Sequence, residues 1–189
     1  PLFNGYCYVD LMNPYAVQAF LESTHEKYKS ACGEHFNKAI PGVFTDEPCY
    51  LMQNKLAEPC LPWSEYLPEY FYKLKGYKIE DNLAALFFKL DGYQKIRFDF
   101  FDAATRLFMD SFTKPYYEWC EKNNLKLTGH FMAEDTIAYQ ISWIGAAMPH
   151  YEFMHWPGID KLGRTVDNQT VTVKQLTSVT EQLGKERAF

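Results

Sequence analysis

Short apolar runs alternate along this chain with stretches in which apolar residues recur every three or four positions. The short runs predict parallel strands at about 6–11, 41–46, 125–130, 149–153, 171–174 and 186–189. The stretches between several of these runs carry helical spacing. Strands that alternate with helices indicate an α/β fold with a parallel sheet.

The predicted helices differ in regularity. Asn13 can cap the first helix and Pro14 suits its first position. A long helix is predicted from about Gln94 to Lys122, with a kink at Pro115. Residues 49–94 are irregular and form an insertion or an elaborated crossover. Shorter helices are predicted at 136–144 and 175–183.

Two α/β architectures compete, a doubly wound open sheet and a (β/α)8 barrel of the TIM type. No glycine-rich nucleotide loop follows any predicted strand, whereas polar residues gather where strands end, as in barrel enzymes. A full barrel needs about 250 residues, and the chain has 189. We therefore interpret residues 1–189 as a partial barrel, truncated at both ends. Its open sheet edges predict poor stability or self-association.

Acidic residues follow two of the predicted strands directly. Asp46 and Glu47 end the run "PGVFTDEP", and Glu134 and Asp135 end "LKLTGHFMAED", four residues after His130. An acid in such a place is often only a turn residue or a helix cap. Two neighbouring strand ends with carboxylates are also the arrangement that glycoside hydrolysis requires, with one carboxyl group as acid and the other as base or nucleophile.

The histidines offer a rival interpretation. His130, His150 and His155 all fall near predicted strand ends, where they could gather around a metal ion together with Asp46 or Glu47. Against this, the H-E-x-x-H motif is absent. Trp156 lies beside His155, and its indole could stack on a sugar ring or lie under a loop.

Composition narrows the range of partners. The net charge is −5 and no basic cluster is present, which argues against nucleic acid. Aromatic residues make up 17% of the chain, a surplus that suits carbohydrate surfaces as well as a core. The five cysteines form no C-x-x-C pair, so they are expected to be buried apolar residues. No apolar run is long enough to predict a membrane span.

Five segments together carry a family resemblance: "YVDLMNP", "GVFTDEP", "LTGHFMAED", "PGID" and "VKQLTSVTEQLGKERAF". In this order they resemble the catalytic barrel of glycoside hydrolase family 106, known for α-L-rhamnosidases. The resemblance implies a (β/α)8 barrel, inverting hydrolysis of a terminal sugar such as α-L-rhamnose, and bound calcium. By analogy with polysaccharide-degrading enzymes it also implies an extracellular or periplasmic protein of a bacterium.

Carried over by motif, the resemblance implies Glu47 as general acid and Glu134 as general base. The remaining polar candidates are expected to contact the sugar: Asp46, His130, Asp135, His155 and Trp156. For an inverting pair we expect carboxyl groups about 6.5–9.5 Å apart, with the acid in the more apolar pocket. The alternatives are a carbohydrate-binding or catalytically degenerate barrel and a metal-dependent hydrolase.

Overall fold

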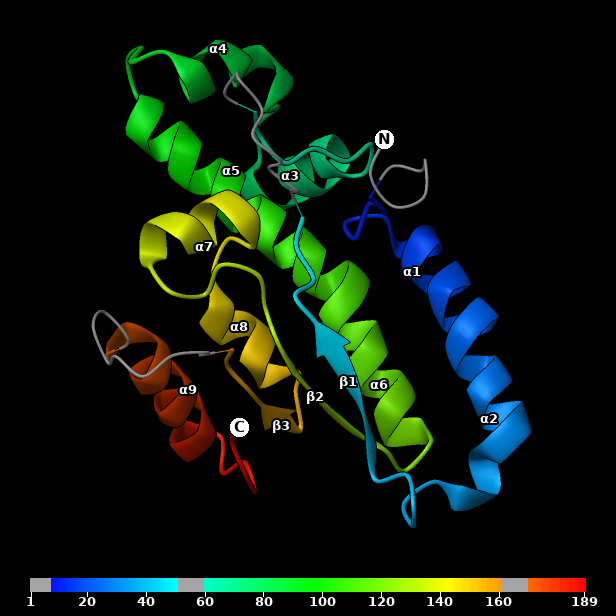
Figure 1. Cartoon of the computed structure of the whole chain (residues 1–189). Coiled ribbons are helices and arrows are strands. Elements are labelled where there is room, and N and C mark those ends of the chain that lie inside the picture. The colour runs from blue at the N-terminus through cyan, green and yellow to red at the C-terminus, as the bar shows by residue number, and fades with distance from the viewer. Residues whose placement is uncertain (1–7, 51–59, 161–169) are drawn as a thin grey trace.

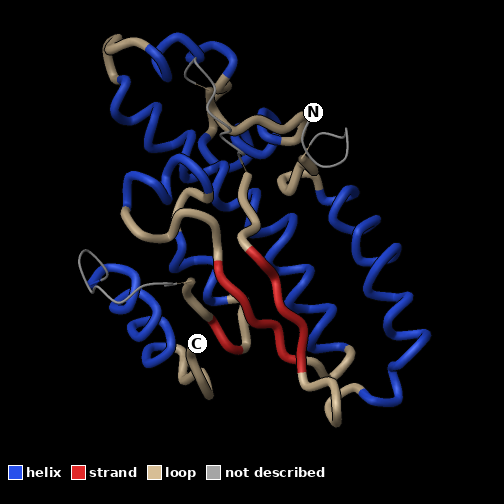
Figure 2. The backbone as a smooth tube through the Cα atoms, viewed as in Figure 1, coloured by secondary structure: helices blue, strands red, loops and turns tan. Residues whose placement is uncertain are grey.

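The sheet at the centre of the molecule has three parallel strands in the order β1-β2-β3 (Figure 1). The structure is a computed structural model that describes residues 8–50, 60–160 and 170–189. The strands are β1 (Gly42–Asp46), β2 (Lys126–His130) and β3 (Trp156–Pro157). Figure 2 shows the strands side by side with helices around them. The expected α/β class with parallel strands is confirmed for this part of the chain.

Two predicted strands coincide with observed ones. The runs at 41–46 and 125–130 form β1 and β2, which pair in register from Gly42 opposite Lys126 to Asp46 opposite His130. Short runs that end in polar residues predicted both strands correctly, although β2 is largely buried and β1 is mostly not. The predicted strand at 6–11 lies partly outside the described residues, and its described part, 8–11, is coil and turn.

Two other strand predictions are wrong. Residues 149–153 belong to helix α8 (Ala147–Glu152), and residues 171–174 belong to helix α9 (Thr170–Gln182). In α9 the buried side chains lie at helical spacing, so the helical period prevails over the β-branched composition of "TVTV". The third strand instead begins at Trp156, seven residues later than predicted.

The chain end approaches β3 in the manner of a further parallel strand. The amide of Phe189 donates to the carbonyl of Pro157 at 3.0 Å, and the amide of Ile159 donates to the carbonyl of Phe189 at 2.9 Å. These two bonds surround Gly158, as in a parallel ladder. Residues 186–189 are not assigned as a strand, but they lie where the predicted strand would pair.

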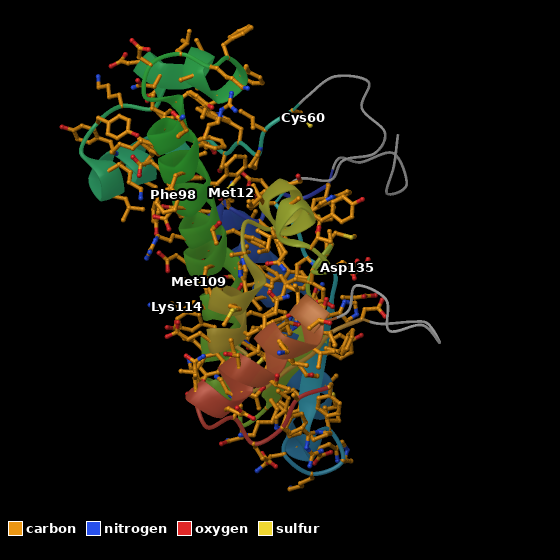
Figure 3. The ribbon with its side chains drawn as sticks, turned by 90° about the vertical axis from the view of Figure 1, so that its left-hand side faces the viewer. Met12, Cys60, Phe98, Met109, Lys114 and Asp135 are labelled. Atoms are coloured by element: carbon orange, nitrogen blue, oxygen red, sulfur yellow. The ribbon has the colours of Figure 1, made fainter. Side chains whose placement is uncertain are left out.

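The predicted long helix is present and passes Pro115 without breaking. It comprises α5 (Tyr93–Phe108), a π-helical turn (Met109–Thr113) and α6 (Lys114–Lys122). Figure 3 labels Met109, the first residue of the π-helical turn, and Lys114, the residue that follows it. The wider turn ends two residues before Pro115, at Thr113, and accommodates a residue that has no amide donor.

The remaining helices surround the strands and the long helix. Asn13 caps α1 as expected, because its side chain accepts from the amides of Tyr15 and Ala16. The predicted helix at 136–144 is confirmed as α7, capped by Thr136. Before β1 lie α1 (Pro14–Phe20), a π-helical turn (Leu21–His25), α2 (Glu26–Cys32) and a short 3-10 turn (Gly33–His35). Between β1 and α5 lie α3 (Leu67–Lys75), a 3-10 turn (Glu80–Asn82) and α4 (Leu83–Phe87). Helix α7 (Ile137–Trp143) follows β2.

The core lies between the strands and the long helix. Phe108 of α5, Phe131 after β2 and His150 of α8 pack together, with the His150 ring 4.5–4.7 Å from the other two ring centroids. Ion pairs join α3 to α5, where the Lys75 ammonium lies 2.6 Å from Asp102 and 3.4 Å from Asp99. In the described ranges, no helix is both long and apolar enough to cross a membrane.

We predict concentration-dependent self-association through β1. Within the described part of the chain, no strand pairs with the side of β1 away from β2, and the apolar side chain of Phe44 is 59% exposed there. Unpaired strand edges with apolar side chains favour pairing with another chain. Light scattering should show association that Phe44→Lys reduces, because lysine protects edge strands. A monomer over the whole concentration range would contradict this prediction.

Candidate active site

Carboxylates and one imidazole meet where β1 and β2 end. Asp46 is the last residue of β1 and pairs in register with His130, the last residue of β2. The two side chains approach, with 3.4 Å between the His130 Nε2 and an Asp46 carboxylate oxygen. The Asp46 side chain is 77% exposed and His130 is buried, so the carboxylate faces solvent while the imidazole ring lies beneath the surface. Parallel pairing therefore brings together two residues that lie 84 positions apart in the chain.

Three further acids belong to the group, namely Glu47 after β1, Glu134 after β2 and Asp160 after β3. Ligand-type atoms of Glu47, His130 and Asp160 all lie within 4.8 Å of one another. Asp160 was not among the residues expected at the site, although it ends the "PGID" motif. It arrives there because β3 is parallel to β2 and ends at the same edge of the sheet. We call Asp46, Glu47, His130, Glu134 and Asp160 the rim cluster.

Glu134 is the most buried member of the rim cluster, with 3% of its surface exposed. The Tyr151 hydroxyl donates to one carboxylate oxygen at 2.8 Å, and the Asp160 amide donates to the other at 2.6 Å. Burial raises the pKa of Glu134 above its usual value, and these two hydrogen bonds and the nearby His130 oppose the rise. Glu134 is therefore buried, as was expected for the general acid of the pair. The family resemblance implied that Glu134 is the general base.

The backbone is strained at both proposed catalytic segments. Glu47 has φ of 48° and Ala133, which precedes Glu134, has φ of 56°. A left-handed conformation costs about 1–2 kcal/mol in a residue with a Cβ. Such strain persists only where the surroundings impose it, and it is common at functional sites. Both segments thus hold their carboxylates in conformations that the chain would not adopt by itself.

Two of the expected sugar contacts lie elsewhere. The Leu127 amide donates to His155 Nδ1 at 2.9 Å, near the start of β2 and far from its rim end. Trp156 pairs with Thr128, and its ring lies 5.8 Å from that of Phe189. Trp156 is the first residue of β3 and His155 directly precedes it, so neither follows the end of a strand as the rim residues do. Asp135, which Figure 3 labels, is half-buried and directly follows Glu134 in the turn after β2.

The three histidines that were weighed as metal ligands do not gather. His150 is completely buried in the core, where its Nδ1 lies 2.7 Å from the Thr113 hydroxyl, and burial lowers its pKa to about 4. His155 lies 3.2 Å from Glu121, away from the rim. Of these three histidines, only His130 lies close to the carboxylates of the rim cluster, so a metal ion there would be bound by one imidazole together with carboxylates.

The donor set fits calcium poorly. Calcium takes six to eight oxygen ligands. The carboxylates of Glu47 and Asp160 offer oxygen ligands, but the His130 imidazole offers nitrogen. Zinc binds both imidazole nitrogen and carboxylate oxygen in proteins. As a set, the three side chains therefore fit a zinc-like ion better than the calcium that the family resemblance implies.

A hollow adjoins the rim cluster. It has a volume of about 260 Å³ and is lined by Asp46, Thr45 and Pro48 from the β1 end and by apolar side chains of α1. A larger hollow of about 490 Å³ lies between α2, β1 and α6, and aromatic residues rather than carboxylates line it. Asp46 is the rim-cluster residue that lines the smaller hollow, and neither Glu47 nor Glu134 is among its lining residues, so the candidate site is defined by the rim cluster itself.

We predict that Glu134→Gln stabilises the protein at neutral pH. The native pKa of Glu134 is raised, so between the ordinary glutamate pKa of about 4.3 and that raised value the native state holds more protons than the unfolded state. Wild-type stability should therefore fall as pH rises through this window, and glutamine removes that loss. Melting curves from pH 4 to 8 should show a difference in Tm that grows with pH. A pH-independent difference would contradict the raised pKa.

Comparison with solved structures shows a structural likeness. The fold is similar to that of a rhamnosidase from Novosphingobium sp. PP1Y, with a TM-score of 0.74 and 18% sequence identity over 96% of this chain. The chain spans 17% of the length of that rhamnosidase. No family model and no curated protein sequence matches the chain. The likeness therefore establishes a rhamnosidase-like fold for this segment.

Proposed function

We propose that this chain is part of the catalytic (β/α)8 barrel of a glycoside hydrolase of the family 106 type. The rim cluster carries the proposal, because it places two glutamates of adjacent parallel strand ends around one group of polar side chains. Catalytic residues of barrel enzymes come from the carboxyl ends of strands. The structural likeness to a rhamnosidase supports a terminal sugar, with α-L-rhamnose as the first candidate.

In the proposed reaction one glutamate protonates the glycosidic oxygen and the other activates a water on the opposite face of the sugar. Burial of Glu134 raises its pKa and favours the acid, leaving Glu47 as the base. This reverses the assignment that the family motif implies. Asp46 is largely exposed, and it can bind sugar hydroxyl groups beside the reacting carbon.

A panel of nitrophenyl glycosides that includes the α-L-rhamnoside tests the proposed function. We expect nitrophenol release from the rhamnoside at a rate well above background. The acid can be recognised in the same panel, because a leaving group that is already acidic needs no proton. Glu134→Gln should therefore retain more activity on the dinitrophenyl than on the mononitrophenyl substrate. A protein that binds these sugars but hydrolyses none of them would instead be a carbohydrate-binding or degenerate barrel.

A metal-dependent hydrolase is the second candidate, supported by the proximity of Glu47, His130 and Asp160. A metal-activated water would require the ion for turnover. We predict that treatment with EDTA lowers kcat by less than about tenfold, because glutamates supply the acid and base. Elemental analysis before and after treatment verifies removal of any ion. Loss of about 100-fold or more, restored by zinc, would favour the metal-dependent mechanism.

A further inference from the structure

A pair of buried amides lies beneath Glu134. Gln140 of α7 is 4% exposed and Gln175 of α9 is 9% exposed. The Gln140 Nε2 donates to the main-chain carbonyl of Glu134 at 2.9 Å and to the Gln175 Oε1 at 3.1 Å. The Gln175 Nε2 donates to the same carbonyl at 3.2 Å. Two side chains 35 positions apart thus converge on one backbone oxygen.

The amide pair has its polar atoms almost fully used inside the protein. The Gln140 Oε1 accepts from the amide of Ala147 at the start of α8, at 3.0 Å. Burying an amide is costly unless it is hydrogen-bonded, and apolar side chains would hold three helices together without that requirement. Here the hydrogen bonds of the pair are directed to the backbone of Glu134. The pair therefore specifies the position of one residue as well as the packing of α7, α8 and α9.

The Glu134 side chain is held as firmly as its backbone. Tyr151 of α8 donates to one carboxylate oxygen and the Asp160 amide to the other. The Tyr151 ring is fully buried and lies 6.3 Å from the Phe131 ring, so its hydroxyl has little freedom to move. The strained residue Ala133 directly precedes the held segment. Fixed bonds of this kind are what keeps a strained conformation in place.

We propose that Tyr151, Gln140 and Gln175 are positioning residues that lock Glu134 in its reactive orientation. This inference rests on the proposed function of Glu134. The three residues reach Glu134 and not the solvent-facing carboxylate of Asp46, so they act through Glu134. A displacement of about 1 Å in a catalytic group can cost about 100-fold in rate. Positioning should therefore appear in kcat rather than in substrate binding.

Tyr151→Phe and Gln175→Met test the proposal, since both keep the side-chain volume. We expect kcat on the nitrophenyl glycoside to fall about 10- to 100-fold, with KM changed less than about twofold. The limb of the pH–rate profile that Glu134 controls should move to higher pH in Tyr151→Phe, because a hydrogen bond that favours the carboxylate is lost. For the general acid, this is the alkaline limb.

Matched controls lie away from the rim cluster. Tyr116→Phe removes a buried hydroxyl that contacts His25 Nε2 at 2.7 Å, and Gln182→Met changes an exposed glutamine at the end of α9. Both controls should keep kcat and the pH profile of the wild type. Unchanged kcat in the two folded test variants would overturn the proposal. If Tyr151→Phe fails to fold, Gln175→Met carries the kinetic test.

Carbon-13 NMR titration of Glu134 separates this inference from the proposed function. The Glu134 resonance, assigned through Glu134→Gln, should titrate at higher pH in Tyr151→Phe than in wild type. If the wild type hydrolyses no glycoside, the proposed function fails, and the titration still tests whether Tyr151 holds the carboxylate. An identical titration in both proteins would overturn the positioning role with or without activity.

Discussion

Glu134→Gln and Glu47→Gln should each lower kcat on a nitrophenyl glycoside by about 10²–10⁴-fold, the usual contribution of a general acid or base. Glutamine keeps the shape of the side chain and can still hydrogen-bond to Tyr151 and to the Asp160 amide. It cannot exchange the proton that the reaction requires. Binding of the sugar should therefore change little, and the loss should appear in kcat.

Asp46→Asn is the matched control for this loss. Asp46 adjoins Glu47 and approaches His130, but 77% of its side chain is exposed. If it only binds sugar hydroxyl groups, the asparagine variant should raise KM more than it lowers kcat. Steady-state kinetics of the three variants on one substrate makes the comparison. Turnover near that of wild type in either glutamine variant would remove that residue from the mechanism.

Gly129→Ala should destabilise the fold by more than about 4 kcal/mol or prevent folding, a loss seen only for severe backbone or core defects. Gly129 lies in β2 with φ of 135°, and a Cβ there would stand 2.0 Å from the Thr45 carbonyl oxygen of β1. Neither backbone can yield without loss of the pairing that brings Asp46 opposite His130. The rim cluster therefore depends on this glycine.

Gly76→Ala separates backbone strain from the steric conflict. Gly76 ends α3 with φ of 79°, and a Cβ there would meet no atom within 4 Å. Strain alone should cost about 1–2 kcal/mol. Chemical denaturation of both variants measures the difference. Equal losses for the two would contradict the close approach of β1 and β2.

The sequence was sufficient to predict β1 and β2, the strands at whose ends Asp46 and His130 lie. The runs before Asp46 and His130 are apolar, short and closed by polar residues, so few other structures suit them. Parallel pairing then follows from the helices between them, and it places the two strand ends together. The long helix was equally clear, because its apolar spacing continues past Pro115.

The errors have local physical causes. "TVTV" alternates like a strand, but Thr172, Leu176 and Val179 are buried on one face of α9, and tertiary packing decides between the two periods. The segment 149–153 is too short for its apolar positions to distinguish the helical period of about 3.6 residues from the strand period of two. Because the third strand begins at Trp156, His155 and Trp156 lie at its start and not at the rim. Asp160 follows its end and lies at the rim instead.

Parts of the site could not have been predicted from spacing. Tyr151 lies 17 positions after Glu134 and was expected in a strand, yet it reaches the carboxylate from a helix. Gln140 and Gln175 carry no motif, and only their burial and their shared contact with the Glu134 carbonyl distinguish them. Contacts of this kind depend on how helices pack, which a single sequence does not specify.

Proton NMR of the sugar released from nitrophenyl α-L-rhamnoside tests the central claim most directly, namely that Glu47 and Glu134 act as an acid and a base across one bound sugar. The spectrum recorded in the first minutes, before the anomers equilibrate, reports the configuration at the anomeric carbon. The proposed mechanism predicts β-rhamnose first, because water attacks the face opposite the leaving group. Release of α-rhamnose first, or no release from any glycoside of the panel, would contradict it.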